Sequence, residues 1–305
     1  MWREREGLSG VNRDRLASPL TAVTIFAMSR PLQPEAPTAP PDRRRRVQSA
    51  QVGLVVLRRL ADLGGRASLT QLSQAIEEPP AKVHRYLASL MVEGFVEQDS
   101  QTSHYFLGVQ AIRVGVAAMR QADPLAAAEP ALVRLRERLG ATCFVAVMGN
   151  LGPTIVRIEE PALPVVVNAR VGSVLPLLWS STGRAFLAFS NDARLHEKAQ
   201  EEWHAATGRL RALLGRARDP VGLLVRKTVA DGVAHVRDAY LPGISAVSAP
   251  VRDSTDRVCA VLTALGPTGS FDPDPAGRPA REVLREANAA AARLGAPAPQ
   301  APPHG

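Results

Sequence analysis

The residues best suited to recognition chemistry in this 305-residue chain lie on one side of a short predicted helix. Arg85 is flanked there by Ala81, Lys82 and Ser89, because the apolar residues recur at helical spacing on the opposite side. Those apolar residues are Val83, Leu87, Leu90 and Met91. Arginine hydrogen-bonds to guanine edges, lysine contacts phosphates, and small side chains allow close approach to the groove. The pattern predicts a helix that docks in the major groove of DNA.

A second group of polar residues, Ser180, Ser181 and Thr182, opens a predicted helix that runs to Phe189. Their hydroxyls can cap the helix, and the free backbone N–H groups and the dipole at a helix start favour a carboxylate. A carboxylate is therefore favoured at this helix start. The alternative is that the three hydroxyls serve only as helix caps.

Residues 68–107 form the framework expected to hold the basic helix. Ser68 and Gln71 make a capping box, S-x-x-Q, that starts a first helix. Pro79 and Pro80 disfavour helical geometry in the residues before them and suit the first turn of the helix that follows. The spacing predicts a helix-turn-helix.

Two short predicted strands, residues 95–98 and 104–107, follow this pair of helices and enclose a polar loop. This hairpin is typical of the wing of a winged helix-turn-helix. An amphipathic helix over residues 48–63, ended by two glycines, precedes the pair. We place the resulting DNA-binding domain at residues 47–108.

Four consecutive arginines precede this domain. One interpretation is a solvated tail, and the other is an arm that reaches backbone phosphates or the minor groove. The DNA contacts expected from the whole region are Arg43, Arg44, Arg45, Arg46, Ser68, Ala81, Lys82, His84, Arg85, Ser89 and His104.

Residues 1–46 are expected to be a disordered tail, basic and rich in proline over residues 31–41, and residues 296–305 a second one. The mildly apolar stretch before Met28 is interrupted by serine, threonine and proline and has no convincing cleavage site, so we do not interpret it as a signal peptide. Our hypothesis is that translation starts at Met28. An intact mass that includes Met1 would contradict it.

A predicted helix within residues 109–122 carries Ile112, Val116 and Met119 at helical spacing, and Gly115 permits close approach of another helix. An apolar stripe of this kind must be buried somewhere. A linker helix that pairs with its copy in a homodimer or tetramer is one interpretation. Packing against the chain's own next domain is the other.

Residues 123–295 have the pattern of a mixed domain, in which apolar and β-branched runs are punctuated by glycine and proline. The predicted strands cover residues 142–148, 154–158, 165–168, 244–251 and 258–265, and the predicted helices residues 125–139, 180–189, 219–231 and 275–294. The fold class is therefore α+β: a winged helix-turn-helix, a linker helix and a sensor-like α/β domain with a largely antiparallel sheet.

Composition narrows the classes of protein. The 46% hydrophobic fraction indicates a globular chain, and no apolar run approaches the roughly 18 residues of a membrane span. The net charge is +8, and residues 43–122 carry 11 Lys and Arg against 6 Asp and Glu, so much of the excess lies in the predicted DNA-binding part. Cys143 and Cys259 lie in apolar segments, which favours free buried thiols and a cytoplasmic location.

The sequence does not predict an enzyme. It contains no P-loop, no G-x-S-x-G, no dinucleotide fingerprint and no H-E-x-x-H or paired-cysteine metal motif, and its six histidines are scattered. We therefore expect no catalytic residues, no metal and no cofactor. An architectural or protein-binding module that uses the winged helix as a dimer interface is the remaining alternative.

Several short motifs follow one another in a fixed order over residues 47–294. They are VHRYL at 83–87, GFVEQD at 94–99, YFLG at 105–108, RVG at 170–172, LPL at 175–177, TGRA at 182–185, GISAVSAPV at 243–251, Asp253 and GP at 266–267. Together they resemble the IclR family of bacterial transcriptional regulators. Each motif alone is weak, but the ordered series is specific.

This resemblance implies an N-terminal winged helix bound to double-stranded operator DNA, a dimerising linker helix and a GAF-like C-terminal domain that holds a small organic or aromatic acid. The effector would lie between the start of the helix at residue 180 and two strands. The contacts implied are Trp179, Ser180, Ser181, Thr182, Ile244, Ser245, Ala246, Ser248, Thr263 and Leu265.

The chain departs from the family pattern at both sites. Glu77 replaces the usual glycine in the turn, and Ala81 and Lys82 stand where small hydroxyl residues often open the recognition helix, so operator preference is not transferable and a different turn is an open alternative. Ala246 and Leu265 stand where small-acid binders often carry polar or thiol residues. Our hypothesis is a more apolar and larger ligand, and tight binding confined to two-carbon acids would contradict it.

Overall fold

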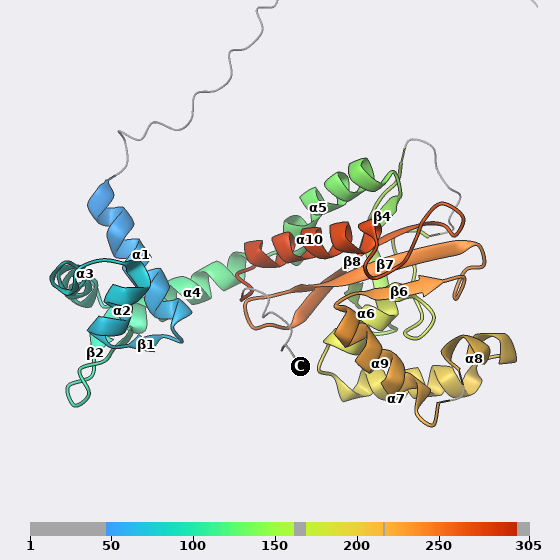
Figure 1. The fold of residues 1–305 in the computed structure, drawn as a ribbon, viewed down its shortest axis with the longest axis horizontal. Coiled ribbons are helices and arrows are strands. Elements are labelled where there is room, and N and C mark those ends of the chain that lie inside the picture. The colour runs from blue at the N-terminus through green and yellow to red at the C-terminus, as the bar shows by residue number, and fades with distance from the viewer. Residues whose placement is uncertain (1–46, 162–168, 216, 298–305) are drawn as a thin grey trace, which may run out of the picture. The chain divides into compact units, whose positions relative to one another are not determined.

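The computed structural model describes residues 47–161, 169–215 and 217–297 of the chain (Figure 1). The arginines at 43–46, the predicted strand over residues 165–168, the N-terminal tail and most of the C-terminal tail lie outside the described residues. The described residues form the mixed α and β fold that the sequence predicts. No helix among them is long and apolar enough to cross a membrane.

The predicted helix-turn-helix is present and begins at the predicted cap. Its elements are α1 (Gln48–Asp62), β1 (Arg66–Ala67), α2 (Leu69–Ile76), α3 (Pro80–Val92), β2 (Val96–Gln98) and β3 (Tyr105–Leu107). The backbone N–H of Gln71 donates to Ser68 Oγ over 3.2 Å, and the N–H of Ser68 donates to Gln71 Oε1 over 2.8 Å. The reciprocal bonds satisfy two donors at the start of α2.

The wing differs from the predicted two-stranded hairpin. It is a three-stranded antiparallel sheet in the order β1-β3-β2, in which Arg66 pairs with Phe106 and Ala67 with Tyr105. The sequence prediction missed β1 because a strand of two residues carries no readable alternation. The extra strand pairs one side of β3, so β3 is hydrogen-bonded on both sides.

Glu77 ends α2 in the left-handed region, with φ 56° and ψ 39°. Its N–H and that of Glu78 donate back to Gln74 O and Ser73 O, at 3.3 and 3.1 Å, which closes the helix in the way a glycine usually does. The turn therefore adopts a backbone conformation that suits glycine although glycine is absent. For a non-glycine residue this conformation costs roughly 1–2 kcal/mol.

The buried side of α3 is narrower than predicted. Val83 and Leu87 are fully buried, and Leu90 is half-buried. Met91, one turn after Leu87, is 38% exposed, so the apolar side of α3 is less completely buried toward the end of the helix. Met91 lies in the last turn of the helix, where the following Gly94 turn takes the chain away.

Two helices follow the wing. α4 (Val109–Gln121) has no buried residue, and its exposed apolar residues are Val109, Ile112, Val114, Val116 and Met119. α5 (Pro124–Leu139) starts at Asp123, whose carboxylate accepts from the N–H groups of Leu125 and Ala126, and ends at left-handed Gly140. Of the two helices, only α5 buries an apolar face against other described residues.

The C-terminal part is built on one antiparallel sheet of five strands. They are β4 (Thr142–Met148), β5 (Pro153–Glu159), β6 (Ala234–Arg237), β7 (Ile244–Arg252) and β8 (Val258–Pro267), in the order β5-β4-β8-β7-β6. α5 and α10 (Arg278–Arg293) cover one face, and α6 (Ser181–Phe189), α7 (Ala193–Ala205) and α9 (Pro220–Asp231) lie on the opposite side (Figure 1).

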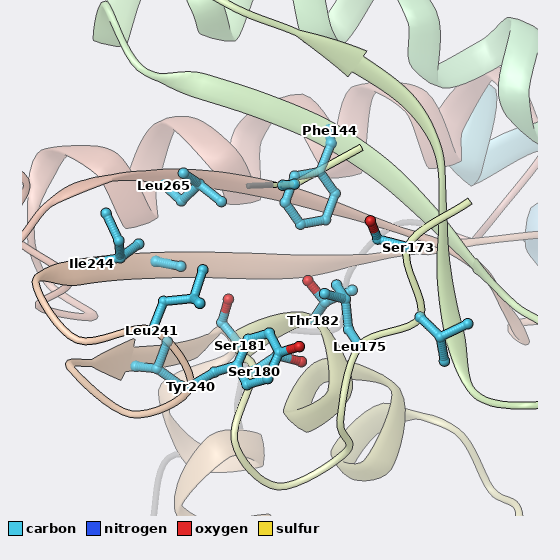
Figure 2. Close-up of a pocket in the computed structure, with 14 residues that line it drawn as sticks. Phe144, Ser173, Leu175, Ser180, Ser181, Thr182, Tyr240, Leu241, Ile244 and Leu265 are labelled. Atoms are coloured by element: carbon cyan, nitrogen blue, oxygen red, sulfur yellow. The ribbon is translucent and has the colours of Figure 1, made fainter. Parts of the chain in front are cut away.

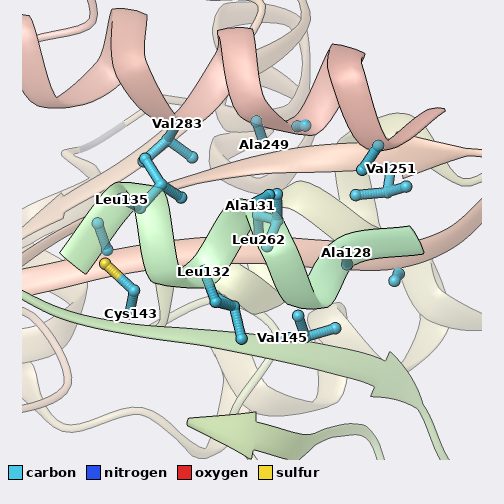
Figure 3. Packing of buried hydrophobic residues seen from close by; sticks show 14 of the residues in the cluster. Ala128, Ala131, Leu132, Leu135, Cys143, Val145, Ala249, Val251, Leu262 and Val283 are labelled. Atoms are coloured by element: carbon cyan, nitrogen blue, oxygen red, sulfur yellow. The ribbon is translucent and has the colours of Figure 1, made fainter. Parts of the chain in front are cut away.

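Alternation along the strands divides the core into two clusters, one on each face of the sheet. Cys143 and Val145 of β4 face the cluster under α5 and α10, whereas Phe144 and Ala146 face the cluster under α6. Figure 3 shows the first cluster, where Leu132 and Leu135 of α5 pack beside the strands. The second face holds the ligand-sized cavity described below.

Three elements of this part were not predicted: β6, α7 and α8 (Gly208–Leu214). The sequence of α7 is strongly polar, and only Leu195 and Ala199 are buried within it. An apolar stripe of two residues is too short to indicate a helix by periodicity. These elements pack against α6, α9 and β7.

Candidate functional site

The outward face of α3 is a solvent-exposed stripe. Ala81, Arg85 and Ser89 follow one another at intervals of four residues, and His84 lies beside them, all exposed. Ser89 Oγ donates to the carbonyl of Arg85 over 3.2 Å, which keeps the serine side chain close to the helix. The guanidinium of Arg85 has no ion-pair partner among the described residues. The stripe therefore presents one free cation on a slim surface.

Three other predicted DNA contacts have partners within the protein. Lys82 Nζ lies 2.7 Å from Glu78 Oε1, an ion pair that opposes its use as a phosphate ligand. The Ser68 hydroxyl accepts the helix-capping bond, and His104 Nδ1 lies 3.1 Å from the carbonyl of Thr102 in the wing. The structure therefore brings Ala81, His84, Arg85 and Ser89 together, while Ser68 and His104 lie on other elements.

The loop of the wing is held by Asp99. Its carboxylate accepts from the backbone N–H groups of Thr102 and Gln101, at 3.0 and 2.9 Å, and these bonds lower its pKa. Arg66 of β1 donates to the same carboxylate and to the Thr102 hydroxyl. The loop therefore keeps a defined conformation without apolar packing.

A cavity of about 380 Å³ lies between the sheet and the start of α6 (Figure 2). Its apolar walls are Phe144, Ala169, Val174, Leu175, Val236, Leu241, Ile244, Ala246 and Leu265, and its polar lining is Ser173, Ser180, Ser181, Thr182 and Tyr240. The volume falls within the roughly 300–1,000 Å³ of small-molecule sites. No charged side chain belongs to this lining among the described residues.

The start of α6 supplies backbone donors to the cavity. Ser180 is the cap: its Oγ accepts from the N–H of Gly183 over 2.9 Å and donates to the carbonyl of Pro176 over 2.7 Å. Its hydroxyl is therefore used within the protein. The N–H groups of Ser181 and Thr182 have no partner in the described part of the chain, so they and the positive end of the helix dipole remain available.

A chain of buried hydroxyls connects α6 to the sheet. Thr182 Oγ1 lies 2.8 Å from Thr263 Oγ1, which lies 2.7 Å from Ser248 Oγ, and Ser248 donates to Ser181 Oγ over 2.8 Å. Each hydroxyl has a single proton. Since the proton of Ser248 goes to Ser181, Thr263 donates to Ser248 and Thr182 donates to Thr263. The proton of Ser181 then has no acceptor among the described residues, and Ser181 lines the cavity.

Not all the predicted effector contacts line the cavity. Ser180, Ser181, Thr182, Ile244, Ala246 and Leu265 do. Ser248 and Thr263 lie behind the lining in the hydroxyl chain, and Ser245 donates to Thr268 over 3.0 Å. Trp179 is buried in the second core cluster instead. It precedes the cap, at the point where the chain turns into α6.

Sequence reasoning missed much of the lining. The missed residues are Phe144, Ala169, Ser173, Val174, Leu175, Val236, Tyr240 and Leu241. A signal existed for one of them, because Leu175 belongs to the LPL motif. Glu202 of α7 was also missed: its carboxylate accepts from the N–H groups of Leu177 and Leu178 over 2.8 and 2.9 Å and so fixes the loop before α6.

A winged helix-turn-helix joined to an antiparallel α/β domain defines a class of regulators with separate DNA-binding and sensor-like parts. Two family models match this chain: the IclR helix-turn-helix domain over residues 49–100 and the bacterial transcriptional regulator IclR C-terminal domain over residues 116–293. The chain belongs to the IclR family of bacterial transcriptional regulators.

Named relatives agree. The transcriptional repressor IclR of Escherichia coli (strain K12) is 30% identical over 181 residues, which are 57% of this chain and 65% of that protein, slightly under two thirds of its length. The HTH-type transcriptional repressor AllR of the same organism is 27% identical over 242 residues, 77% of this chain and 86% of that protein.

Solved structures show the same fold. The crystal structure of Pseudomonas aeruginosa HmgR is 40% identical, with a TM-score of 0.73 over 82% of this chain and 99% of that chain. The repressor BlcR of Agrobacterium tumefaciens is 16% identical, with a TM-score of 0.65 over 82% and 98%, which shows the fold alone.

Proposed function

We propose that this chain is a DNA-binding transcription regulator whose operator affinity is controlled by one organic acid held in the 380 Å³ cavity. The observation that carries the proposal is the start of α6: Ser180, Ser181 and Thr182 line a cavity with apolar walls, and the N–H groups of Ser181 and Thr182 have no partner among the described residues. In this proposal, residues 47–108 bind DNA and residues 123–295 bind the effector. Residues 109–122 form the helix that links these two parts and pairs with its copy in a second subunit.

The DNA side of the proposal rests on the stripe of α3. Arg85 is exposed, free of a carboxylate and flanked by the small residues Ala81 and Ser89, so the helix can approach base edges closely. Lys82 would contact phosphate only after releasing Glu78. The four arginines at 43–46 are proposed as an arm that adds salt-dependent affinity for the backbone.

The chemistry of the cavity favours a monocarboxylate with an apolar body. Its donors are neutral: the N–H groups of Ser181 and Thr182, and the hydroxyls of Ser181, Ser173 and Tyr240. One carboxylate at the helix start is stabilised by these donors and the dipole. A second carboxylate would lie among leucines and phenylalanine without a partner, which is costly.

The exposed apolar stripe of α4 supports a homodimer or a tetramer. Ile112, Val116 and Met119 lie at helical spacing on a helix with no buried residue, and an adjacent Gly115 leaves open space beside the backbone. Pairing of two copies of α4 would bury this stripe. Two copies of α3 would then face two half-sites of one operator.

The test has two measurements on the full chain. Thermal shift with a panel of aromatic, branched and two-carbon acids should give the largest stabilisation with an aromatic or branched monocarboxylate. The amide of that acid should need at least a tenfold higher concentration to give the same stabilisation. The best acid should then change the affinity for DNA from upstream of the protein's own gene, measured by fluorescence anisotropy. Stabilisation confined to two-carbon acids, or an acid without effect on DNA affinity, contradicts the proposal.

A further inference from the structure

A second cavity, of about 310 Å³, lies beside the first. It is lined by Arg184, Leu213, His235, Val236, Arg237, Ala239 and residues 272–275. Val236 lines both cavities, and Arg184 lies on α6, two residues after Thr182. The proposed function makes no use of this second cavity.

Arg184 is a buried guanidinium without a counter-charge. Its side chain belongs to a residue that is only 9% exposed, and no carboxylate lies within ion-pair distance among the described residues. Nε donates to the carbonyl of Leu178 over 2.7 Å and Nη1 to the carbonyl of His235 over 2.8 Å. Nη2 has no partner in the described part of the chain, yet it keeps accessible surface. The free donor therefore borders the cavity that Arg184 lines.

An unpaired buried cation is unusual because its desolvation costs several kcal/mol and two neutral carbonyls offset only part of that. Burial lowers the pKa of Arg184 to about 10, so the group stays charged at neutral pH. Burial and the charge of Arg184 also lower the pKa of the neighbouring His235, which is therefore neutral at pH 7. The interior of the cavity thus carries one positive charge.

The rim of this cavity has the opposite character. Asp272 and Asp274 are both exposed. Asp272 Oδ1 pairs with Arg237 over 3.0 Å, which neutralises it in part, and Asp274 Oδ1 accepts from the N–H of Ala276 over 2.8 Å and has no cationic partner within the described chain. A ligand that spans this cavity would meet a cation inside and a carboxylate at the entrance.

We propose that this second cavity binds a small ammonium carboxylate, an amino acid or a close relative, with its carboxylate on Arg184 and its ammonium toward Asp274. A carboxylate would supply the missing counter-charge through Nη2, in a charge-assisted bond. A dicarboxylate would place its second charge against Asp272 and Asp274, and an unsubstituted monocarboxylate would forgo the attraction of the rim. This selectivity differs from that of the first cavity, which has no charged lining.

The experiment is saturation-transfer NMR on the full chain with three probes of equal carbon number: beta-alanine, propionate and malonate. Beta-alanine should bind saturably, propionate at least threefold more weakly and malonate most weakly. Arg184→Gln should weaken the binding of beta-alanine at least tenfold. Arg194→Gln, which removes an exposed arginine elsewhere in the domain, should leave its affinity unchanged.

A second variant keeps the test decisive if Arg184→Gln does not fold. Asp274→Asn alters an exposed side chain and retains the oxygen that accepts from Ala276, so the fold should persist. It should reduce the preference for beta-alanine over propionate at least threefold. Absence of saturable beta-alanine binding, an unchanged affinity in folded Arg184→Gln, or an unchanged preference in Asp274→Asn would each overturn the proposal.

Discussion

The side-chain oxygens of Thr182 and Thr263 lie 2.8 Å apart, so the first turn of α6 is tied to the middle of β8 by a hydrogen bond between two buried threonines. This bond is the first step of the hydroxyl chain that ends at Ser181. The helix start that we propose as the carboxylate site is therefore positioned by the sheet as well as by its own cap.

Thr263→Val should remove this tie, leaving the Thr182 proton without its acceptor and Ser248 Oγ without its donor. The loss of buried hydrogen bonds predicts a decrease of about 1–3 kcal/mol in the free energy of unfolding. Thr142→Val is the matched control, since Thr142 is a buried strand threonine with no side-chain bond recorded among the described residues. Urea unfolding followed by tryptophan fluorescence measures both, and equal destabilisation of the two variants would contradict the role of the chain.

Ser181→Ala should weaken ligand binding, and it also removes the acceptor of the buried Ser248 proton. It removes the one proton that the hydroxyl chain leaves free toward the first cavity, and a lost hydrogen bond to a charged group predicts roughly tenfold weaker binding of the best acid from the panel. Calorimetric titration measures it. Ser173→Ala removes a hydroxyl of the cavity lining that does not belong to α6 and should have a smaller effect; the reverse order would move the carboxylate away from the helix start.

The turn before α3 shows how far the sequence could predict the structure. The capping box of Ser68 and Gln71 and the paired prolines are local signals, and α2 and α3 begin close to where these signals place them. The left-handed conformation of Glu77 contradicts the local preference of a non-glycine residue, so the sequence indicated a departure from the family pattern but not its outcome.

The first cavity was predictable only in part for the same reason. The hydroxyls at 180–182 indicate the start of a helix, and sequence motifs indicate β7 and β8. Tyr240, Leu241 and Val236 come to the cavity through β6 and the loop after it, whose short and polar sequence carries no periodic signal. Arg184 belongs to a motif, but its lack of a carboxylate partner depends on tertiary contacts.

Glu77→Gly should stabilise the helix-turn-helix. Glycine adopts φ 56° without a steric penalty, so the substitution relieves strain. Because glycine also loses more conformational entropy on folding, the net increase in the free energy of unfolding should be about 0.5–1 kcal/mol. Glu93→Gly is the control, because Glu93 ends α3 at φ −83° and glycine there should destabilise. Amide exchange in α2 and α3 should slow in the first variant and quicken in the second. Faster exchange in Glu77→Gly would show that the glutamate side chain stabilises the turn.

Arg85→Ala should cost roughly 1–3 kcal/mol on the specific operator and little on unrelated DNA, whereas Lys82→Ala should weaken all sequences alike. The ion pair between Lys82 and Glu78 allows a second test of the role of Lys82. Glu78→Gln should free Lys82 and raise the affinity for any DNA. It should also steepen the dependence of that affinity on salt concentration by the equivalent of up to about one phosphate contact. Anisotropy titrations at several salt concentrations separate sequence-specific affinity from phosphate-dependent affinity. Unchanged affinity in both Arg85→Ala and Lys82→Ala would refute docking through α3.

Glu286 predicts a pH dependence of stability for the effector domain. This carboxylate is 3% exposed on α10 and accepts from Arg134 Nη2 over 2.7 Å and Arg138 Nη1 over 2.9 Å, both on α5. Burial alone would raise its pKa, but the hydrogen bonds and charges of the two arginines outweigh burial and hold the pKa below its ordinary value of 4.5. A carboxyl with a depressed folded pKa stabilises the fold above its unfolded pKa, and that contribution is lost as pH falls through the folded value.

Glu286→Gln should therefore lower the free energy of unfolding by about 1–3 kcal/mol at pH 7, because the glutamine accepts weaker bonds and two arginines lose their partner. The difference from the parent should shrink as pH falls below 4.5, where the parent protonates the same group. Glu137→Gln, at an exposed site on α5, should change the stability by less than about 0.5 kcal/mol. Urea unfolding from pH 3 to 7, followed by the fluorescence of Trp179 and Trp203, measures all three proteins. A difference that stays constant across this range would mean that the charge of Glu286 does not join α5 to α10.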